Sequence, residues 1–142
     1  MTHSTGTAST IDHLAPAGSS VPAVLRAVQV ISVLAVLNLV CQYVTAGQIL
    51  PRGGPAIGVH ATGAIVLHVV TGLLALAAIL YARAQRGPWW PPVVAVLVFV
   101  CSFVQAYFGD EGNLKLHVPG AMVLTVGIVW LTAWSFTRAV RR

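Results

Sequence analysis

The sequence predicts an all-α protein whose fold is a four-helix transmembrane bundle, built from two helical hairpins in tandem. Composition is the first reason: of 142 residues 57% are hydrophobic and 8% are charged, and the mean hydropathy is +0.85. A soluble protein of this size needs far more polar surface. The second reason is the presence of four apolar runs, each close to the roughly 20 residues that a helix needs to cross the hydrocarbon core.

The first run is expected near Val21 to Gly47. Residues 1–20 are mostly Thr, Ser, Gly and Ala and lack an apolar pattern, so they are predicted to form a disordered cytoplasmic tail, with 21–142 as the transmembrane domain. No basic stretch precedes a short apolar segment, and the run is long enough to span a membrane. We therefore expect a retained helix and not a cleaved signal peptide.

The second run is expected near Ala56 to Ala82, the third near Pro91 to Phe108 and the fourth near Leu114 to Thr137. The third run opens after a pair of tryptophans and on a pair of prolines. Tryptophan favours the headgroup region, and proline is tolerated at the start of a helix. The beginning of the third helix is therefore predicted to lie at a membrane interface.

Arginines gather at alternate ends of the runs, which predicts the orientation of the bundle. They lie at the start of the first run, between the second and third, and after the fourth: Arg26, Arg83, Arg86, Arg138, Arg141 and Arg142. Cytoplasmic connections carry such an excess, so both termini are expected in the cytoplasm. Since the sequence shows no targeting signal, the expected location is the plasma membrane of a bacterium. The other connections hold Arg52 alone, and Asp110, Glu111 and Lys115 together. The net charge of +5 is then a topology signal and does not indicate nucleic-acid binding.

The second and fourth runs open on similar segments, His-Ala-Thr-Gly-Ala from His60 and His-Val-Pro-Gly-Ala from His117. Without gaps, positions 60–74 match positions 117–131 at seven of fifteen places. Upstream, Gln42 and Gln105 occupy comparable places near the ends of the preceding runs. These likenesses predict two hairpin repeats related by a pseudo-twofold axis along the membrane normal.

Both histidines then fall at one depth near the outer surface, on helices that run in the same direction. If they face the bundle axis, their imidazoles reach one iron from opposite sides, as in a b-type haem with two histidine ligands. Gly63 and Gly120 would leave room beside the macrocycle, although glycine also serves close helix packing. The alternative for the histidine pair is a set of hydrogen bonds between helices, without a cofactor.

His68 lies eight residues after His60, about 12 Å deeper, and its repeat partner is Thr125. It is a further candidate for contact with a cofactor, as a hydrogen-bond partner of a haem propionate or a quinone. The alternative, which we favour, is a hydrogen bond to a neighbouring helix. Cys41 and Cys101 lie inside apolar runs, where free cysteine packs as a small hydrophobe.

A span that ends in Gln and Gly, an outer loop and a histidine at the start of the next span, repeated once, resembles one four-helix half of the heme A synthase family. The resemblance rests on His60 and His117 and covers about residues 25–137. It implies a four-helix bundle with a haem near the outer side. The chain departs from the family in having one half, in carrying Ile57 where the family has a functional glutamate, and in lacking cysteine from Gln48 to Pro55.

These departures argue against oxidation of a haem methyl group by this chain alone, and no catalytic residue is assigned. We therefore expect a protein that is not an enzyme on its own. The hypothesis is an electron-transfer protein with one haem b, held by His60 and His117, which acts with a membrane redox partner or in a larger complex. The competing hypothesis is a cofactor-free membrane interaction or assembly protein.

Overall fold

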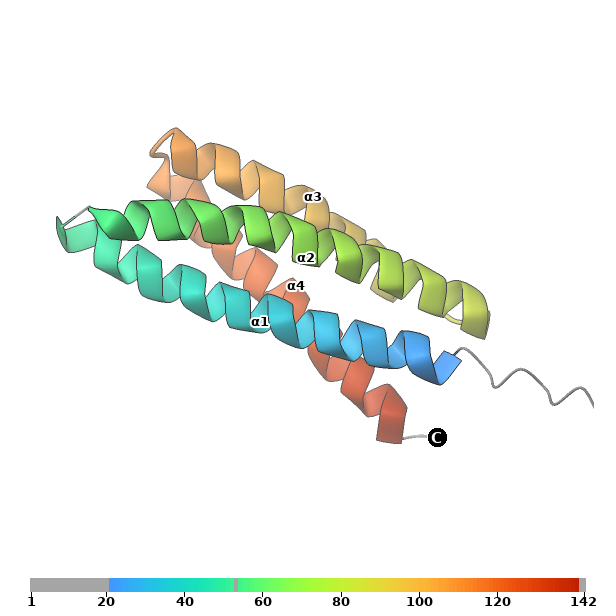
Figure 1. Cartoon of the computed structure of the whole chain (residues 1–142). Helices are drawn as coiled ribbons and strands as arrows, with labels where there is room; N and C mark the ends of the chain where they lie inside the picture. The colour runs from blue at the N-terminus through green and yellow to red at the C-terminus, as the bar shows by residue number, and fades with distance from the viewer. Residues whose placement is uncertain (1–20, 53, 141–142) are drawn as a thin grey trace, which may run out of the picture.

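The computed structural model describes residues 21–52 and 54–140 of the chain. The predicted disordered tail, residues 1–20, lies outside the described residues. The described residues form four α-helices joined by short connections (Figure 1). Helix α1 spans Val21–Arg52, α2 spans Pro55–Gln85, α3 spans Trp90–Asp110 and α4 spans Leu114–Val140.

The all-α class and the four predicted helices are confirmed, and the helices are longer than the apolar runs. Helix α1, for example, continues from Gly47 to Arg52. Hydropathy locates the segment that prefers lipid, whereas the helix continues until the backbone is forced to turn. Between α1 and α2 the backbone turns at Gly54, which has a φ of 85°, and α2 then begins with Pro55. Proline is favoured at this position because the backbone N–H that it lacks would have no hydrogen-bond partner in the first turn of a helix.

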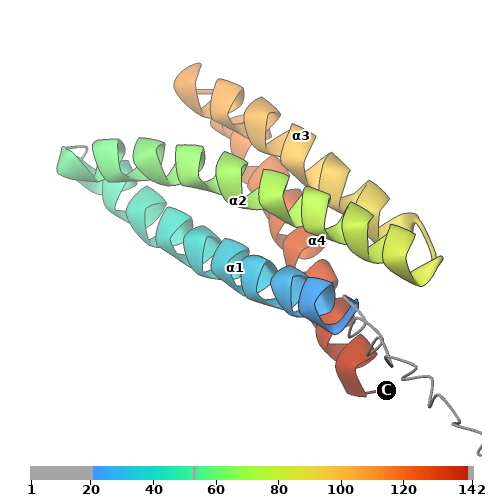
Figure 2. The ribbon, with the colours of Figure 1, turned by 45° about the vertical axis from the view of Figure 1, so that its right-hand side comes forward.

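The helices pack in a ring in which each contacts its neighbours in sequence, and α4 also contacts α1. No Cα atom of α2 lies within 8 Å of one in α4, so these two helices stand diagonally across the bundle. Figures 1 and 2 show α4 behind α1 and α2 from two directions. Side chains on α2 and α4 that point inward therefore meet in the centre of the bundle, without contact between their backbones.

All four helices are long and apolar enough to cross a membrane. Large apolar side chains are exposed along every helix, for example Leu37, Val69, Leu97 and Val126. Such a surface would be a liability in water but suits contact with lipid tails. This is the architecture of a multi-pass membrane protein, as the composition predicts.

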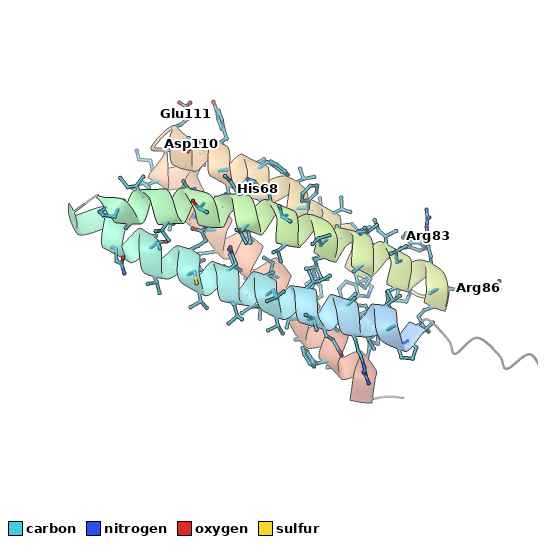
Figure 3. All side chains as sticks on the ribbon, in the orientation of Figure 1. His68, Arg83, Arg86, Asp110 and Glu111 are labelled. Carbon is cyan, nitrogen blue, oxygen red and sulfur yellow. The ribbon has the colours of Figure 1, made fainter. Side chains whose placement is uncertain are left out.

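Charged side chains mark the two ends of the bundle (Figure 3). Arg83 and Arg86 lie where α2 ends, and we call this the arginine end. Asp110 and Glu111 lie where α3 ends, and we call this the acidic end. All four residues are exposed. The arginines and the acidic residues thus lie at opposite ends of the bundle, as the sequence predicts. The side of the membrane that each end faces stays a prediction.

Aromatic packing closes the arginine end. Trp90 of α3 stacks on Trp130 of α4 with ring centres 5.0 Å apart, and meets Trp134 edge-on at 5.5 Å. The Arg138 guanidinium lies 5.8 Å from the Trp134 ring centre. A core of Leu74, Ala78 and Leu131, together with Trp134, fills this part of the bundle.

A second core lies nearer the acidic end, with Ala35, Leu39, Leu67, Leu124 and Ile128 as members. These five side chains are at most 7% exposed. Above them, toward the acidic end, the interior changes from tightly packed aliphatic groups to polar side chains around a cavity. The fold thus places the predicted site above a sealed apolar floor.

Candidate functional site

His60 and His117 meet inside the bundle at the acidic end. His60 is the sixth residue of α2 and His117 the fourth of α4, and both are partly buried. Their ring centres lie 6.2 Å apart, with an angle of 64° between the ring planes. The predicted pair is therefore close in space, although its two helices stand on opposite corners of the bundle.

A cavity of about 320 Å³ opens between the four helices at this place. Both histidines line it, as do Gln42 of α1, Gln105 of α3 and the deeper His68 of α2. Its remaining walls are mostly apolar. A mostly apolar cavity of this size with a few converging polar groups is the usual character of a small-molecule site.

The hydrogen bond of His60 fixes which of its ring nitrogens carries the proton. Its Nδ1 lies 2.9 Å from the Thr45 hydroxyl of α1. That hydroxyl has one proton, and it lies 2.9 Å from the Cys41 carbonyl, to which it donates. With that proton assigned to the carbonyl, the Thr45 oxygen accepts from His60, and the His60 proton is on Nδ1. The lone pair is left on Nε2.

His117 reaches the same tautomer through a different partner. Its Nδ1 lies 2.9 Å from the backbone carbonyl of Gln105 on α3. A carbonyl oxygen only accepts, so Nδ1 again carries the proton and Nε2 the lone pair. Metal-bound histidines are usually held in this way, by a hydrogen bond from the ring nitrogen that does not bind the metal.

The spacing of the two rings suits a single metal ion between them. A metal–nitrogen bond is about 2 Å and a ring nitrogen lies about 1 Å from the ring centre, so two imidazoles on opposite sides of one ion have centres about 6 Å apart. The observed separation is 6.2 Å. Within the described residues no group of three or more His, Cys, Asp or Glu side chains could hold a metal ion. A metal at this pair would thus need further ligands from a macrocycle such as a porphyrin.

Two glutamines accompany the histidines, one in each hairpin. The amide nitrogen of Gln42 donates to the His60 backbone carbonyl at 3.1 Å, which ties α1 to α2. The side-chain oxygens of Gln42 and Gln105 are both buried and have no hydrogen-bond partner. An unpaired buried acceptor costs about 1–3 kcal/mol. Both glutamines line the cavity, so a bound molecule with hydrogen-bond donors would relieve this cost.

Gly63 and Gly120 make room for these glutamines. A Cβ at Gly63 would lie 2.8 Å from the Gln42 amide nitrogen, and one at Gly120 would lie 2.6 Å from Cδ of Gln105. Neither glycine lines the cavity, so the space they provide is occupied by protein side chains. Gly109 has a related role, because a Cβ there would lie 3.0 Å from the His117 ring.

His68 forms the hydrogen bond to a neighbouring helix that we favoured. Its Nδ1 lies 2.8 Å from the Ser102 hydroxyl of α3, and its ring stacks on Phe103 with centres 4.1 Å apart. It also lines the cavity, at the end away from the histidine pair. Its repeat partner Thr125 instead pairs with the Tyr43 hydroxyl at 2.8 Å, so the repeats differ at this depth.

The position that carries glutamate in the heme A synthase family brings no carboxylate here. Ile57 is 53% exposed, and no Asp or Glu lines the cavity. The two cysteines are free: Cys41 of α1 is exposed and Cys101 of α3 is partly buried. Their helices do not contact each other, so the cysteines pack separately.

Sequence reasoning did not identify Thr45, Ser102 or the Gln105 carbonyl as partners of the histidines. A signal for the two hydroxyl groups was present, because each lies in an apolar run where its partner could only be another protein group. The carbonyl could not be found, since every residue has one. Comparison with known proteins gives no further guide, because no family model, curated protein or solved structure matches this chain.

Proposed function

We propose that this protein binds one b-type haem between His60 and His117 and carries electrons in a bacterial plasma membrane. The observation that carries the proposal is the ring separation of 6.2 Å between two histidines whose Nδ1 atoms are both engaged. Two imidazoles that hold their lone pairs on Nε2 are ready to bind a metal, and burial beside apolar walls suits a macrocycle.

The haem, when bound, supplies a centre that gains and loses one electron. The chain supplies its surroundings. Thr45 and the Gln105 carbonyl hold the two imidazoles in one tautomer and orientation, which increases their basicity as ligands. The apolar floor below, with Leu39, Leu67 and Leu124, keeps water from that side of the site. Low polarity and restricted solvent access are among the levers by which proteins set a redox potential.

The position of the site favours a redox partner at the acidic end. The histidines lie within about two turns of the beginnings of α2 and α4, so the edge of a cofactor there would lie near that surface. We propose that this end faces outward, and that the partner is a membrane or extracytoplasmic protein or a larger complex. The chain resembles only one half of a heme A synthase and carries Ile57 where that family has a glutamate. Oxidation of a haem methyl group is therefore not part of the proposal.

The competing role, a cofactor-free assembly protein, requires histidines that serve only to join helices. Both do join helices, since His60 bonds α1 and His117 bonds α3. Those bonds use Nδ1 alone. In the described part of the chain no hydrogen bond involves Nε2 of either ring, and this favours the haem proposal.

An absorption spectrum of the detergent-purified protein, oxidised and then reduced with dithionite, tests the proposal. The expected result is a sharp reduced α band of a low-spin centre, with about one haem per chain in the pyridine haemochrome assay. A colourless protein, even after expression with added haem, would overturn the proposal and leave the assembly role.

A further inference from the structure

The cavity continues beyond the histidine pair into an inner pocket, formed by Leu39, Leu67, His68, Ser102 and Leu124. His68 lies eight residues beyond His60 on α2, or about 12 Å further from the acidic end. This depth is well inside the apolar length of the helix. The polar groups here thus face a space that membrane-soluble molecules reach more readily than water-soluble ones.

His68 presents a hydrogen-bond acceptor to this space. We assign the Ser102 hydroxyl proton to its shortest contact, the Phe99 carbonyl at 2.6 Å, so that the Ser102 oxygen accepts from His68. The proton of His68 is therefore on Nδ1, and Nε2 keeps its lone pair. No hydrogen bond of the described residues involves this Nε2.

The cavity contains several acceptors that have no hydrogen-bond partner. Gln42 Oε1 is buried and unpaired, while the Gln42 amide nitrogen is used on the His60 carbonyl. The hydroxyl protons of Tyr43 and Ser102 are used as well, since Thr125 already donates to Ala121 and must accept from Tyr43. Spare donors remain at the Gln105 amide and at the second N–H of the Gln42 amide, whose first N–H bonds the His60 carbonyl.

We infer that the inner pocket binds the ring of a hydroquinone, with one hydroxyl donated to Nε2 of His68 and the other to a glutamine oxygen. Donors on the ligand would satisfy the unpaired glutamine oxygens, and the spare amide N–H groups would bond its oxygen atoms. The ligand has to be neutral, because among the described residues no Asp, Glu, Lys or Arg lines the cavity to balance a buried charge. It has to be compact and apolar apart from its hydroxyls, because the pocket walls are leucines.

A substituted aromatic ring also fits the available volume. A cavity of about 150 Å³ lined by apolar side chains accepts benzene. The present cavity, of about 320 Å³ from the histidine pair to His68, has space for such a ring with methyl or methoxy substituents when no haem occupies it. Quinols that dissolve in membranes carry their two hydroxyls on opposite sides of one ring, which suits acceptors on different helices. This binding needs no haem, so the inference stands or falls separately from the proposed function.

Calorimetric titration of the full chain in phosphatidylcholine nanodiscs tests the inference, with empty nanodiscs subtracted to remove partition into lipid. Tetramethylhydroquinone and its dimethyl ether are titrated into haem-free protein with dithionite present, so that the ligand stays reduced and the whole cavity is open to it. The two compounds have the same ring and differ in their donors. Each unpaired buried acceptor that is satisfied should strengthen binding about tenfold, so the hydroquinone should bind at least that much more tightly.

Variants of His68 test whether this residue contributes to the tighter binding of the hydroquinone. His68→Phe removes one of the two acceptors and should reduce the difference between the two compounds about tenfold, whereas His68→Gln retains an acceptor and should keep more of it. Thr62→Val, on the same helix but outside the cavity lining and bonded only to the Gly58 carbonyl, serves as the control and should keep the full preference. Equal binding of the two compounds to the wild type, or a full preference in His68→Phe, would overturn the inference.

Discussion

The Thr45 hydroxyl on α1 accepts a hydrogen bond from Nδ1 of His60 at 2.9 Å, whereas Nδ1 of His117 donates to the backbone carbonyl of Gln105 on α3. The two imidazoles thus share one tautomer but depend on different kinds of group. Only one of the two supports can be removed by changing a side chain. This asymmetry gives a matched pair of variants for testing whether the histidines act as ligands.

Thr45→Val should weaken haem binding, because His60 loses the acceptor that holds its proton on Nδ1. Loss of such a partner typically costs 10–100-fold in metal affinity. Gln105→Ala should have a smaller effect, since the carbonyl that His117 uses belongs to the backbone and remains. Haem titration of the apoprotein with both variants measures the difference. Equal losses would mean that the Thr45 contact does not support a ligand.

Substitution of either member of the histidine pair should remove most of the haem, while His68→Ala should leave the low-spin spectrum largely intact. His60→Gly and His117→Gly add a sharper comparison, because free imidazole can occupy the space that the side chain vacates. Imidazole at millimolar concentration should restore the low-spin spectrum in both glycine variants. Equal haem content in the wild type and in the alanine variants of His60, His117 and His68 would refute the ligand assignment.

Composition and hydropathy were sufficient to predict the four helices, because the cost of an unpaired backbone group in lipid leaves few alternatives to a helix. They were less informative about where the helices end. The extension of α1 to Arg52 and of α2 to Gln85 depends on turn residues such as Gly54 and Arg86, which has a left-handed backbone with a φ of 48°. Such boundaries are decided by local backbone geometry, which hydropathy does not record.

The candidate site was predictable in part, and for a similar reason. The repeated His-x-x-Gly-Ala segment predicted that His60 and His117 would meet, since symmetry places equivalent residues at one depth. It did not predict what the glycines do. In the structure Gly120 lies against the Gln105 side chain, a contact between α3 and α4 that depends on the rotation of each helix about its axis. A single sequence with apolar residues on every face does not determine that rotation.

Gly120→Ala should destabilise the bundle, because its Cβ would overlap the Gln105 side chain at 2.6 Å from Cδ. Overpacking of this kind costs about 1–3 kcal/mol. Gly63→Ala should cost less, since its Cβ would lie 3.2 Å from Cδ of Gln42, a milder overlap with the same kind of group. Unfolding of the detergent-solubilised protein by a denaturing detergent measures both effects.

Gly47→Ala is the matched control for these glycine variants. Gly47 also lies within a helix, but a Cβ there meets nothing within 4 Å. The substitution should be neutral or stabilising by up to about 1 kcal/mol, because alanine favours the helix over glycine. Adding Gln105→Ala to Gly120→Ala should recover most of the lost stability. If the double variant does not regain stability, the loss in Gly120→Ala does not come from overlap with the Gln105 side chain.

The orientation of the bundle is testable with single cysteines at its two ends. Asn113, in the exposed connection of the acidic end, should be labelled by a membrane-impermeant maleimide in intact cells. Pro88, in the connection of the arginine end, should be labelled only after lysis. Both variants are built on a chain in which Cys41 and Cys101 are replaced by alanine, so that each carries one thiol.

The physical reason for this expectation is the distribution of charge, since Arg83 and Arg86 flank one connection and Asp110 and Glu111 the other. Arginine in short connections favours the cytoplasmic side. The result also bears on the proposed function, because the histidine pair lies at the acidic end. Labelling of Pro88→Cys and not Asn113→Cys in intact cells would invert the topology. It would move the proposed redox partner from the outer face of the membrane to the cytoplasm, while leaving the ligand assignment of His60 and His117 untouched.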